Sequence, residues 1–188
     1  MTDEVLICVD VETAGPFPAR YAMLSIGACL VMDIGETFYV ELKPDKTDVE
    51  PDALAISGLI MDDLQRNGTE PGKALLDFEK WVKKVVPQGN RPVLVAFNAP
   101  FDWMFVHDYF LRYLGRNPFG HSALDIKAYF MGQTGSKWSE TSMQHISKHF
   151  LDEVRLTHNA LRDAQDQAEV FRKILNLNPR ENIPESVL

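Results

Sequence analysis

The sequence predicts an α/β fold in which a three-stranded antiparallel meander is followed by alternating helices and strands. Three runs rich in branched and aromatic residues, at 5–12, 21–32 and 36–43, form the expected meander, and a turn-like segment at 33–36 joins the last two. After Pro51 the pattern changes, and apolar residues recur every three to four positions, as on an amphipathic helix. Together these patterns favour one mixed sheet flanked by helices.

The second half of the chain alternates helices with two further strands. PVLVAF at 92–97 is too apolar for a strand with one wet face, so we expect a central strand, followed by a helical run to about Leu114. A short strand is expected at 122–126, where Asp125 is placed to cap the next helix. Further helices are predicted at 52–58, from Pro71 through Val86, at 127–131, at 139–150 and at 159–175.

Length and composition indicate one globular domain. The chain has 188 residues, of which 45% are hydrophobic and 24% charged, which is an ordinary balance for a protein with one core. We assign residues 1–177 to this domain and the segment 178–188, with two prolines and no periodicity, to a C-terminal tail. Cys8 and Cys29 lie in strand-like runs and are expected in the core.

The sequence carries no recognisable signal for export or for membrane insertion. Its N-terminus has acidic residues before the first apolar run, without a basic region, and no apolar stretch approaches ~18 residues. We therefore expect a cytoplasmic protein with no membrane contact.

Two carboxylates leave the first strand side by side. Strand alternation places Asp10 and Glu12 on one face, whereas Val9 and Val11 point to the other. Like charges at this spacing in an apolar strand repel each other and resist burial, so they need either a cation or a wet strand end. A divalent metal ion meets that need, and a solvent-facing strand end is the plainer alternative.

Two later segments carry further candidates. Asp102 follows the strand at 92–97, which places it in the first turn of a helix. The plainer alternative is an acid at this position that only interacts favourably with the helix dipole. If both were helical, His158 and Asp163 would point about 140° apart, so a shared site requires His158 to lie in the loop before the helix. A histidine there is equally consistent with a cap or surface residue. The apolar stripe of that last helix comprises Leu161, Ala164, Ala168, Phe171 and Leu175.

The segments VDVETAG, NAPFD and HNALRD, in this order and separation, resemble the three signature segments of the DEDDh family of 3′→5′ exonucleases. Within this family the chain is most similar to the ribonuclease T group, because PDALAISG at 51–58 and RNPFGHSALD at 116–125 also match. The resemblance implies a ribonuclease-H-like, DnaQ-like fold. It also implies a hydrolase that removes nucleotides from the 3′ end of single-stranded RNA or DNA.

Carried over position by position, the resemblance assigns metal binding to Asp10, Glu12, Asp102 and Asp163, and the role of general base to His158. Carboxylate oxygens suit Mg²⁺, with Mn²⁺ as a substitute, and two such ions stabilise the attacking and leaving oxygens in phosphodiester hydrolysis. An imidazole with a pKa of ~6.5 accepts a proton near neutrality. Because two divalent ions offset four carboxylates, metal binding is expected to raise the melting temperature.

The resemblance also implies substrate-binding residues. Phe17 and Phe101 occupy positions at which ribonuclease T stacks bases, and Thr13 occupies one that contacts the terminal nucleotide. Asn98 and Trp103, within and next to NAPFD, are further candidates, although Trp103 fits a core position equally well.

The preferred substrate is left open by three features. Pro16 and Ile56 depart from the ribonuclease T pattern, which leaves the terminal-base preference undecided. The net charge of −8 contrasts with ribonuclease T, which uses a basic patch contributed across a dimer. The resemblance to ribonuclease T leaves a homodimer open as one expectation for this chain. A partial substitute for that patch would comprise Arg91, Arg112, Arg116 and Lys137.

Other functions share the same residues. A proofreading-type DNA exonuclease subunit or an oligonucleotide scavenger would have the same carboxylates and histidine and differ in substrate grip. An exonuclease that works only with a polymerase or helicase partner is a third possibility. A catalytically silent nucleic-acid-binding module on the same fold would be expected to lose at least one of the five residues, and all five are present.

Overall fold

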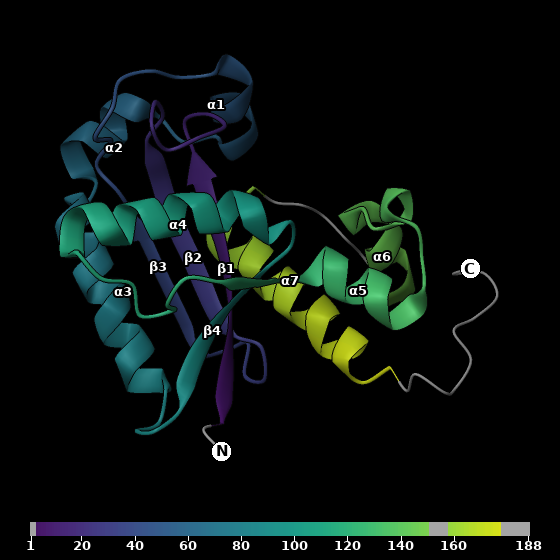
Figure 1. Cartoon of the computed structure of the whole chain (residues 1–188). Coiled ribbons are helices and arrows are strands. Elements are labelled where there is room, and N and C mark those ends of the chain that lie inside the picture. Colours follow the sequence, from purple (N-terminus) through teal and green to yellow (C-terminus); the bar gives the residue numbers. More distant parts are fainter. Residues whose placement is uncertain (1–2, 151–157, 178–188) are drawn as a thin grey trace.

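Five strands form one mixed sheet in the order β3-β2-β1-β4-β5 (Figure 1). The computed structural model describes residues 3–150 and 158–177. β2 pairs antiparallel with both β1 and β3, whereas β4 runs parallel to β1 and β5 runs parallel to β4. The predicted meander followed by parallel strands is therefore confirmed. The strands are β1 Glu4–Thr13, β2 Met23–Leu30, β3 Thr37–Glu41, β4 Arg91–Ala96 and β5 Ala123–Asp125.

The helices follow the predicted order with two differences. A separate helix, α2, has a single buried residue, Leu64, so it carried no apolar periodicity to detect. The helix expected at 139–150 is divided into a 3-10 turn and a shorter α-helix. The predicted tail at 178–188 lies outside the described residues. The helices are α1 Pro51–Ser57, α2 Met61–Asn67, α3 Pro71–Val85, α4 Ala99–Leu114, α5 Ile126–Thr134, η1 Trp138–Glu140, α6 Met143–Phe150 and α7 Ala160–Leu175.

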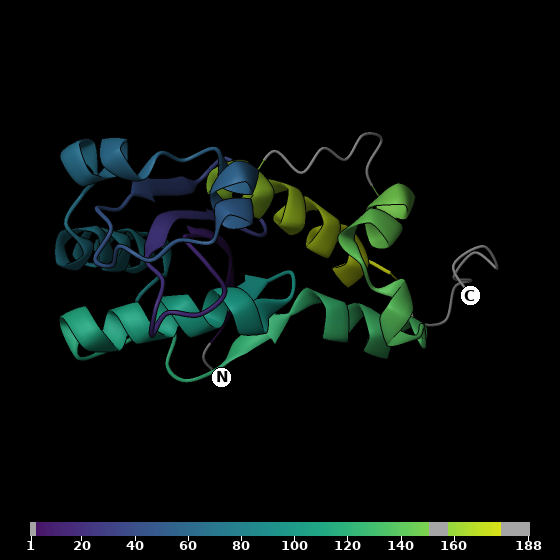
Figure 2. The ribbon, with the colours of Figure 1, turned by 90° about the horizontal axis from the view of Figure 1, so that it is seen from above.

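Helices cover both faces of the sheet (Figure 2), and alternate residues of β1 belong to the two cores beneath them. Ile7, Val9 and Val11 belong to a core shared with α3 and α4. Cys8 belongs to the opposite core, shared with α5, α6 and α7, and Cys29 joins it there. Both cysteines are fully buried, as predicted. Because side chains alternate along a strand, the even-numbered positions beyond Cys8 face α7. None of the helices in the described ranges is long and apolar enough to span a membrane.

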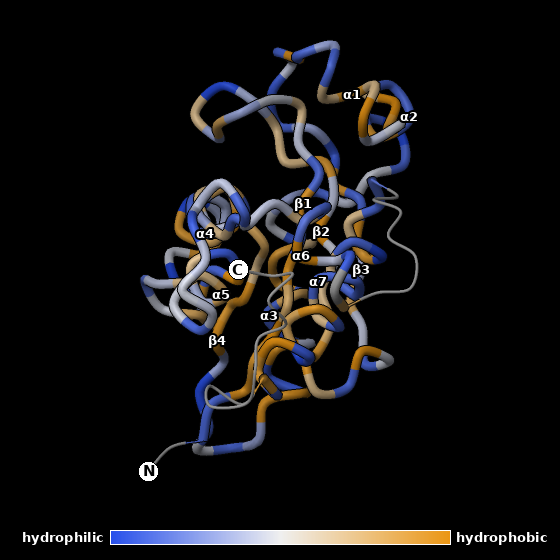
Figure 3. Tube along the Cα trace, turned by 90° about the vertical axis from the view of Figure 1, so that its right-hand side faces the viewer, coloured by the Kyte–Doolittle hydropathy of each residue, from blue (hydrophilic) through white to orange (hydrophobic). Residues whose placement is uncertain are grey.

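The central strand β4 leads directly into α4. Its trace is hydrophobic along most of its length in Figure 3, and Leu94 and Val95 are buried in the two opposite cores. Asn98 turns the chain with a positive φ of 64°. The carboxylate of Asp125 accepts the backbone N–H groups of Asn98 and Ala99 at 3.0 and 3.2 Å. It also caps α5, so the predicted capping role is confirmed and extends to this turn.

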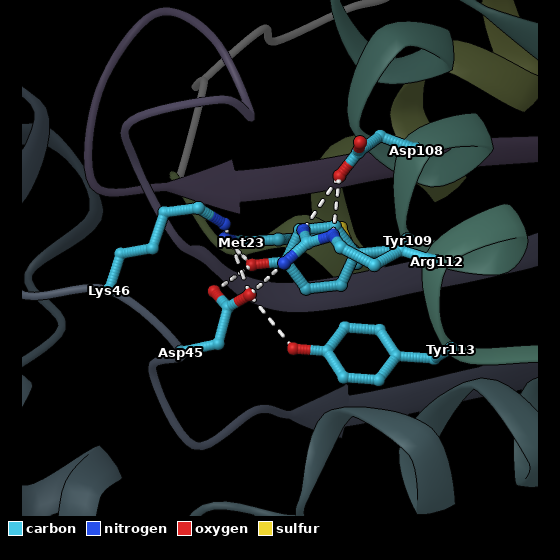
Figure 4. A network of polar contacts seen from close by, with 7 residues as sticks. All are labelled: Met23, Asp45, Lys46, Asp108, Tyr109, Arg112 and Tyr113. Atoms are coloured by element: carbon cyan, nitrogen blue, oxygen red, sulfur yellow. Dashed lines mark hydrogen bonds and ion pairs between the residues drawn. The ribbon is translucent and has the colours of Figure 1, made fainter.

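A polar network holds the far end of β1 (Figure 4). The Tyr109 hydroxyl accepts the Met23 N–H at 2.7 Å and donates to Asp45 at 2.5 Å. Met23 pairs with Thr13 where the register of β1 and β2 shifts, immediately after Glu12. The network therefore fixes the backbone next to an acid predicted to bind metal. The other donors to Asp45 are Lys46, Arg112 and Tyr113.

Gly27 on β2 allows the first turn of α7 to rest directly on the sheet. A Cβ atom at this position would lie 2.1 Å from the carbonyl carbon of Ala160 and 2.2 Å from the amide nitrogen of Leu161. Gly27 is also the cross-strand partner of Asp10. The absence of a side chain here thus brings α7 to the same place on the sheet as the first predicted acid.

We predict that Gly27→Ala destabilises the protein by about 1–3 kcal/mol, because backbone rather than a flexible side chain would have to move. The measurement is the melting temperature, which is expected to fall by several degrees. Gly132→Ala in α5 is the control, because nothing lies within 4 Å of a Cβ there. Equal melting temperatures for Gly27→Ala and the wild type would contradict this account of α7.

Candidate active site

Three of the predicted acids converge between β1 and α7. Carboxylate oxygens of Asp10, Glu12 and Asp163 all lie within 4.8 Å of one another. Asp10 and Glu12 come from the α7-facing side of β1, as their alternation predicted, and Asp163 from the first turn of α7. A divalent cation prefers such hard oxygen ligands.

Asp102 approaches the same site from α4. Its side chain is 4% exposed, and its Oδ1 accepts the backbone N–H of Val11 at 3.1 Å. It lies outside the three-acid group, yet it lines the same cavity of about 250 Å³ and its charge raises the pKa of Asp10. The hydrogen bond from Val11 thus links β1, which carries Asp10 and Glu12, to α4, which carries Asp102.

His158 lies in the loop before α7, as the helical-phase argument required. Its φ is 51°, in the left-handed region, and its side chain is exposed and lines the cavity. Asn159 follows it as the helix cap, with its side-chain oxygen accepting the Arg162 N–H at 3.2 Å. This cap ends the loop and starts the helix that carries Asp163.

The electrostatics of the cluster favour either protons or metal ions. Burial, followed by the charges of Asp102, Glu12 and Asp163, raises the pKa of Asp10 well above its ordinary value. Burial and then Asp163 raise the pKa of Glu12 to about 7. Burial also raises the pKa of Asp102 to about 8, against the hydrogen bond from Val11. Such a donor set is suited to divalent cations, which would relieve the repulsion.

Two of the five predicted substrate residues line the cavity. Phe101 is half-buried, with its ring centroid 5.5 Å from that of Phe105, and Asn98 is exposed. Both come from the turn between β4 and α4, next to Asp102.

The other three predicted substrate residues lie outside the cavity lining. The Thr13 hydroxyl donates to the Gly15 carbonyl at 2.9 Å, and its side chain is buried. Phe17 is 42% exposed and packs edge-on against Tyr21. Trp103 stacks on His107 at 4.9 Å and packs against the core beside α3 and α4, which fits the alternative of a core position.

Comparison with known proteins identifies the family. A family model for RNase T, described as exonuclease, matches residues 7–171. The chain belongs to this exonuclease family. The 3′-5′ DNA exonuclease Cap18 of Escherichia coli is 42% identical over 180 residues, which cover 96% of both proteins. Ribonuclease T of Klebsiella pneumoniae subsp. pneumoniae is 30% identical over 181 residues, with 90% of this chain and 84% of the relative covered.

Solved structures agree on the fold of this exonuclease. The nuclease domain of 3′hExo, a DEDDh family member bound to rAMP, has a TM-score of 0.77 at 17% identity, with 91% of each chain covered. Escherichia coli Exonuclease I in complex with a dT13 oligonucleotide has a TM-score of 0.73 at 20% identity, covering 95% of this chain and 42% of that one. The predicted ribonuclease-H-like fold is confirmed. The protein is a 3′→5′ exonuclease acting on nucleic acid, of a family that depends on divalent metal ions.

Gln167 lines the candidate site and was missed by the sequence analysis. Its side chain is 5% exposed, and its Nε2 donates to Asp10 Oδ1 at 2.7 Å. Its Oε1 accepts the Phe97 N–H at 2.8 Å. Because a backbone N–H can only donate, the amide must present its NH₂ group to Asp10. Gln167 therefore orients one oxygen of the carboxylate and ties it to the end of β4.

The buried face of α7 explains the omission. Leu161 and Leu175, assigned to the apolar stripe, are only half-buried, whereas Asp163, Gln167 and Ile174 are buried. The buried face of α7 is therefore rotated, relative to the predicted apolar stripe, toward the side of the helix that carries Asp163. A polar residue four positions after an acid, on the same helix face, was the available signal.

The three arginines of the expected basic patch each form an ion pair within the chain, and their role in binding nucleic acid stays a prediction. Arg91 pairs with Glu4, Arg112 with Asp45 and Asp108, and Arg116 with Glu79. Each guanidinium is thus engaged by a carboxylate of this chain. Lys137, the fourth member, makes no ion pair among the described residues and lies in a different part of the fold.

We predict that the metal-free protein loses stability as pH rises from about 5 to 8. A carboxyl group whose folded pKa is raised stabilises the fold below its unfolded pKa, and this contribution is lost as pH rises through the folded value. For Glu12, a pKa of about 7 corresponds to about 3 kcal/mol. Asp45 and Glu79, with pKa values lowered to about 2, are ionised throughout and contribute nothing to this slope.

The measurement is thermal unfolding in EDTA at both pH values, with Glu12→Gln as the comparison. The variant should show a flatter dependence on pH, and millimolar Mg²⁺ or Mn²⁺ should raise the melting temperature of the wild type at pH 8. Identical pH profiles for wild type and Glu12→Gln would count against a buried, repelling cluster.

We predict that Gln167→Met weakens metal binding about 10–100-fold, because residues that orient a ligand carboxylate typically have effects of this size. Isothermal titration calorimetry with Mn²⁺ measures the affinity directly. Gln165→Met is the matched control on the same helix, because its amide donates to the Ile34 carbonyl at 2.9 Å, away from the acids. Equal Mn²⁺ affinities in the two variants would remove Gln167 from the site.

Proposed function

We propose that this exonuclease removes nucleotides one at a time from the 3′ ends of single-stranded DNA, by hydrolysis with two Mg²⁺ ions. The observation that carries the proposal is the convergence of Asp10, Glu12 and Asp163 within 4.8 Å, with Asp102 and the exposed His158 around the same cavity. The arrangement presents metal ligands and a proton acceptor to one small volume.

The four carboxylates would hold the metal ions. Two divalent cations bound there supply stabilisation of the charge that develops on the attacking and leaving oxygens of a phosphodiester. The four negative charges of Asp10, Glu12, Asp102 and Asp163 match the four positive charges of two such ions. Mg²⁺ is our proposal for the ions, and Mn²⁺ suits the same oxygen donors.

His158 is the residue placed to take a proton from the attacking water. Its imidazole lines the cavity and is exposed, so it can pass the proton on to solvent. Its position outside the helix leaves the ring free of the fixed direction that a helical residue has. Asp163, five residues later, is held by the buried face of α7.

The terminal nucleotide is held by residues at the rim. Phe101 lines the cavity and offers an aromatic surface that stacks with any base. Asn98 is beside it and offers an amide. Phe17 and Thr13 remain candidates from the loop after β1, whereas the core packing of Trp103 gives it the weakest case.

DNA is favoured over RNA by the relatives. The greater identity, 42%, is with a DNA exonuclease over nearly the full length of both proteins, against 30% with ribonuclease T. An RNA substrate, a proofreading or scavenging role and a polymerase or helicase partner are alternatives that substrate assays separate. The cytoplasmic location and the homodimer stay predictions.

We predict that 3′-labelled single-stranded DNA is degraded faster than single-stranded RNA or a duplex with a 3′ overhang, and that EDTA abolishes cleavage. His158→Ala should lower kcat by about 10²–10⁴-fold, the usual contribution of a general base. Asp163→Asn should be at least as impaired, because it removes a metal ligand. Glu169→Gln on the same helix is the control, since Glu169 pairs with Lys173 at 3.0 Å. Cleavage in EDTA, or full activity of Asp163→Asn, would refute the mechanism.

A further inference from the structure

The positive charges of this acidic protein are divided unevenly along the chain. Every lysine and arginine from Arg20 to Arg116 forms an ion pair with a carboxylate. Beyond Arg116, five basic residues in the described ranges make no ion pair. These five are Lys127, Lys137, Lys148, Arg162 and Arg172. The described lysines and arginines that no carboxylate engages therefore lie on and around α5, α6 and α7.

Trp138 presents a large aromatic surface among these charges. Its side chain is 52% exposed, more than any other described aromatic residue, whereas Trp81 is 8% exposed. The Lys127 ammonium lies 4.1 Å from the centroid of the Trp138 ring, and Lys137 precedes Trp138 in the chain. A lysine at this distance is attracted to the face of the ring and keeps its positive charge.

The backbone around Trp138 is held in place. The Glu140 carboxylate accepts the Lys137 N–H at 2.7 Å, and the Thr141 hydroxyl donates to the Trp138 carbonyl at 2.8 Å. The 3-10 turn η1 is thus closed on both sides. A fixed turn presents the indole at little cost in conformational entropy.

Trp138 and Lys127 are joined to the lining of the active-site cavity through short stretches of chain. Lys127 is two residues after Asp125, whose carboxylate accepts the N–H of the cavity residue Asn98 at 3.0 Å. Met143, which lines the cavity, begins α6 five residues after Trp138. Figures 1 and 2 place α5 and α6 together on the side of the molecule away from α3. A strand that leaves the cavity toward α5 and α6 therefore meets this surface.

We propose that Trp138, Lys127 and Lys137 form a second nucleic-acid subsite, the Trp138 platform, which binds the substrate strand upstream of its terminal nucleotide. The indole stacks on a base without reading its identity, and the two ammonium groups contact neighbouring phosphates. The inference rests on the proposed exonuclease function. It assigns the binding of longer strands to the part of the protein in which five described lysines and arginines form no ion pair.

The experiment compares two substrates. A single-stranded oligodeoxynucleotide of about 12 nucleotides is long enough to reach beyond the cavity, given typical site sizes. The p-nitrophenyl ester of thymidine 5′-monophosphate has one nucleotide and no upstream strand. The readout is the ratio of kcat/KM for the oligonucleotide to that for the ester. We expect Trp138→Ala to lower this ratio about tenfold, and Trp138→Phe to restore most of it because a ring is retained.

Salt dependence tests the lysines separately. For Lys127→Gln, the slope of log kcat/KM against log salt concentration on the oligonucleotide should become shallower by about 0.7, the value for one phosphate contact on a single strand. Lys84→Gln is the control, because that exposed lysine pairs with Glu36 at 3.1 Å and lies on α3. Its slope should equal that of the wild type.

The outcomes separate the inference from the function on which it rests. A wild type that cleaves both substrates, with the same ratio in Trp138→Ala and the same slope in Lys127→Gln, would overturn the platform alone. A wild type that cleaves neither substrate would overturn the proposed function and the platform with it. A lowered ratio that Trp138→Phe restores supports stacking.

Discussion

The direct contact of α7 with the sheet at Gly27 is the constraint on which the active site depends. Three of the acids come from two elements that are far apart in sequence, and their oxygens meet only because α7 begins at backbone distance from β2. Asp10 is the cross-strand neighbour of Gly27, so the same point fixes both partners. Any side chain there would lift the helix start and separate Asp163 from β1.

The site carries an electrostatic cost that the rest of the fold offsets. Burial and mutual repulsion raise the pKa values of Asp10, Glu12 and Asp102, and each raised value opposes folding of the metal-free protein at neutral pH. The surroundings limit this cost through hydrogen bonds to charged oxygens, from Val11 to Asp102 and from Gln167 to Asp10. Apolar cores on both faces of the sheet hold the strands rigid beneath the cluster.

The sequence pattern predicted those parts of the site that follow from local periodicity. Alternation in β1 placed Asp10 and Glu12 on one face, and the 3.6-residue period of α7 excluded His158 from the helix. The roles of Gly27 and Gln167 were not predicted, because they depend on contacts between elements that are distant in sequence. Nothing adjacent in sequence indicates that a helix start will rest on β2. For Gln167 the local signal was its place four residues after Asp163, which does not show that its side chain reaches Asp10 on β1. Two arginine ion pairs were not predicted for the same reason. Glu4 is distant in sequence from its partner Arg91, and Glu79 from its partner Arg116.

The distribution of ion pairs resolves the difficulty that a net charge of −8 presents for a nucleic-acid enzyme. Overall charge governs long-range attraction, but contact with a phosphate depends on cations that no carboxylate of the same protein already engages. From Arg20 to Arg116, each lysine and arginine is already engaged by a carboxylate of this protein. Two divalent metal ions would neutralise the four carboxylates at the cavity, and Lys127 and Lys137 supply positive charge on α5 and beside η1. An acidic protein can therefore offer a short positive path at its site, which suits single-stranded ends better than long duplexes.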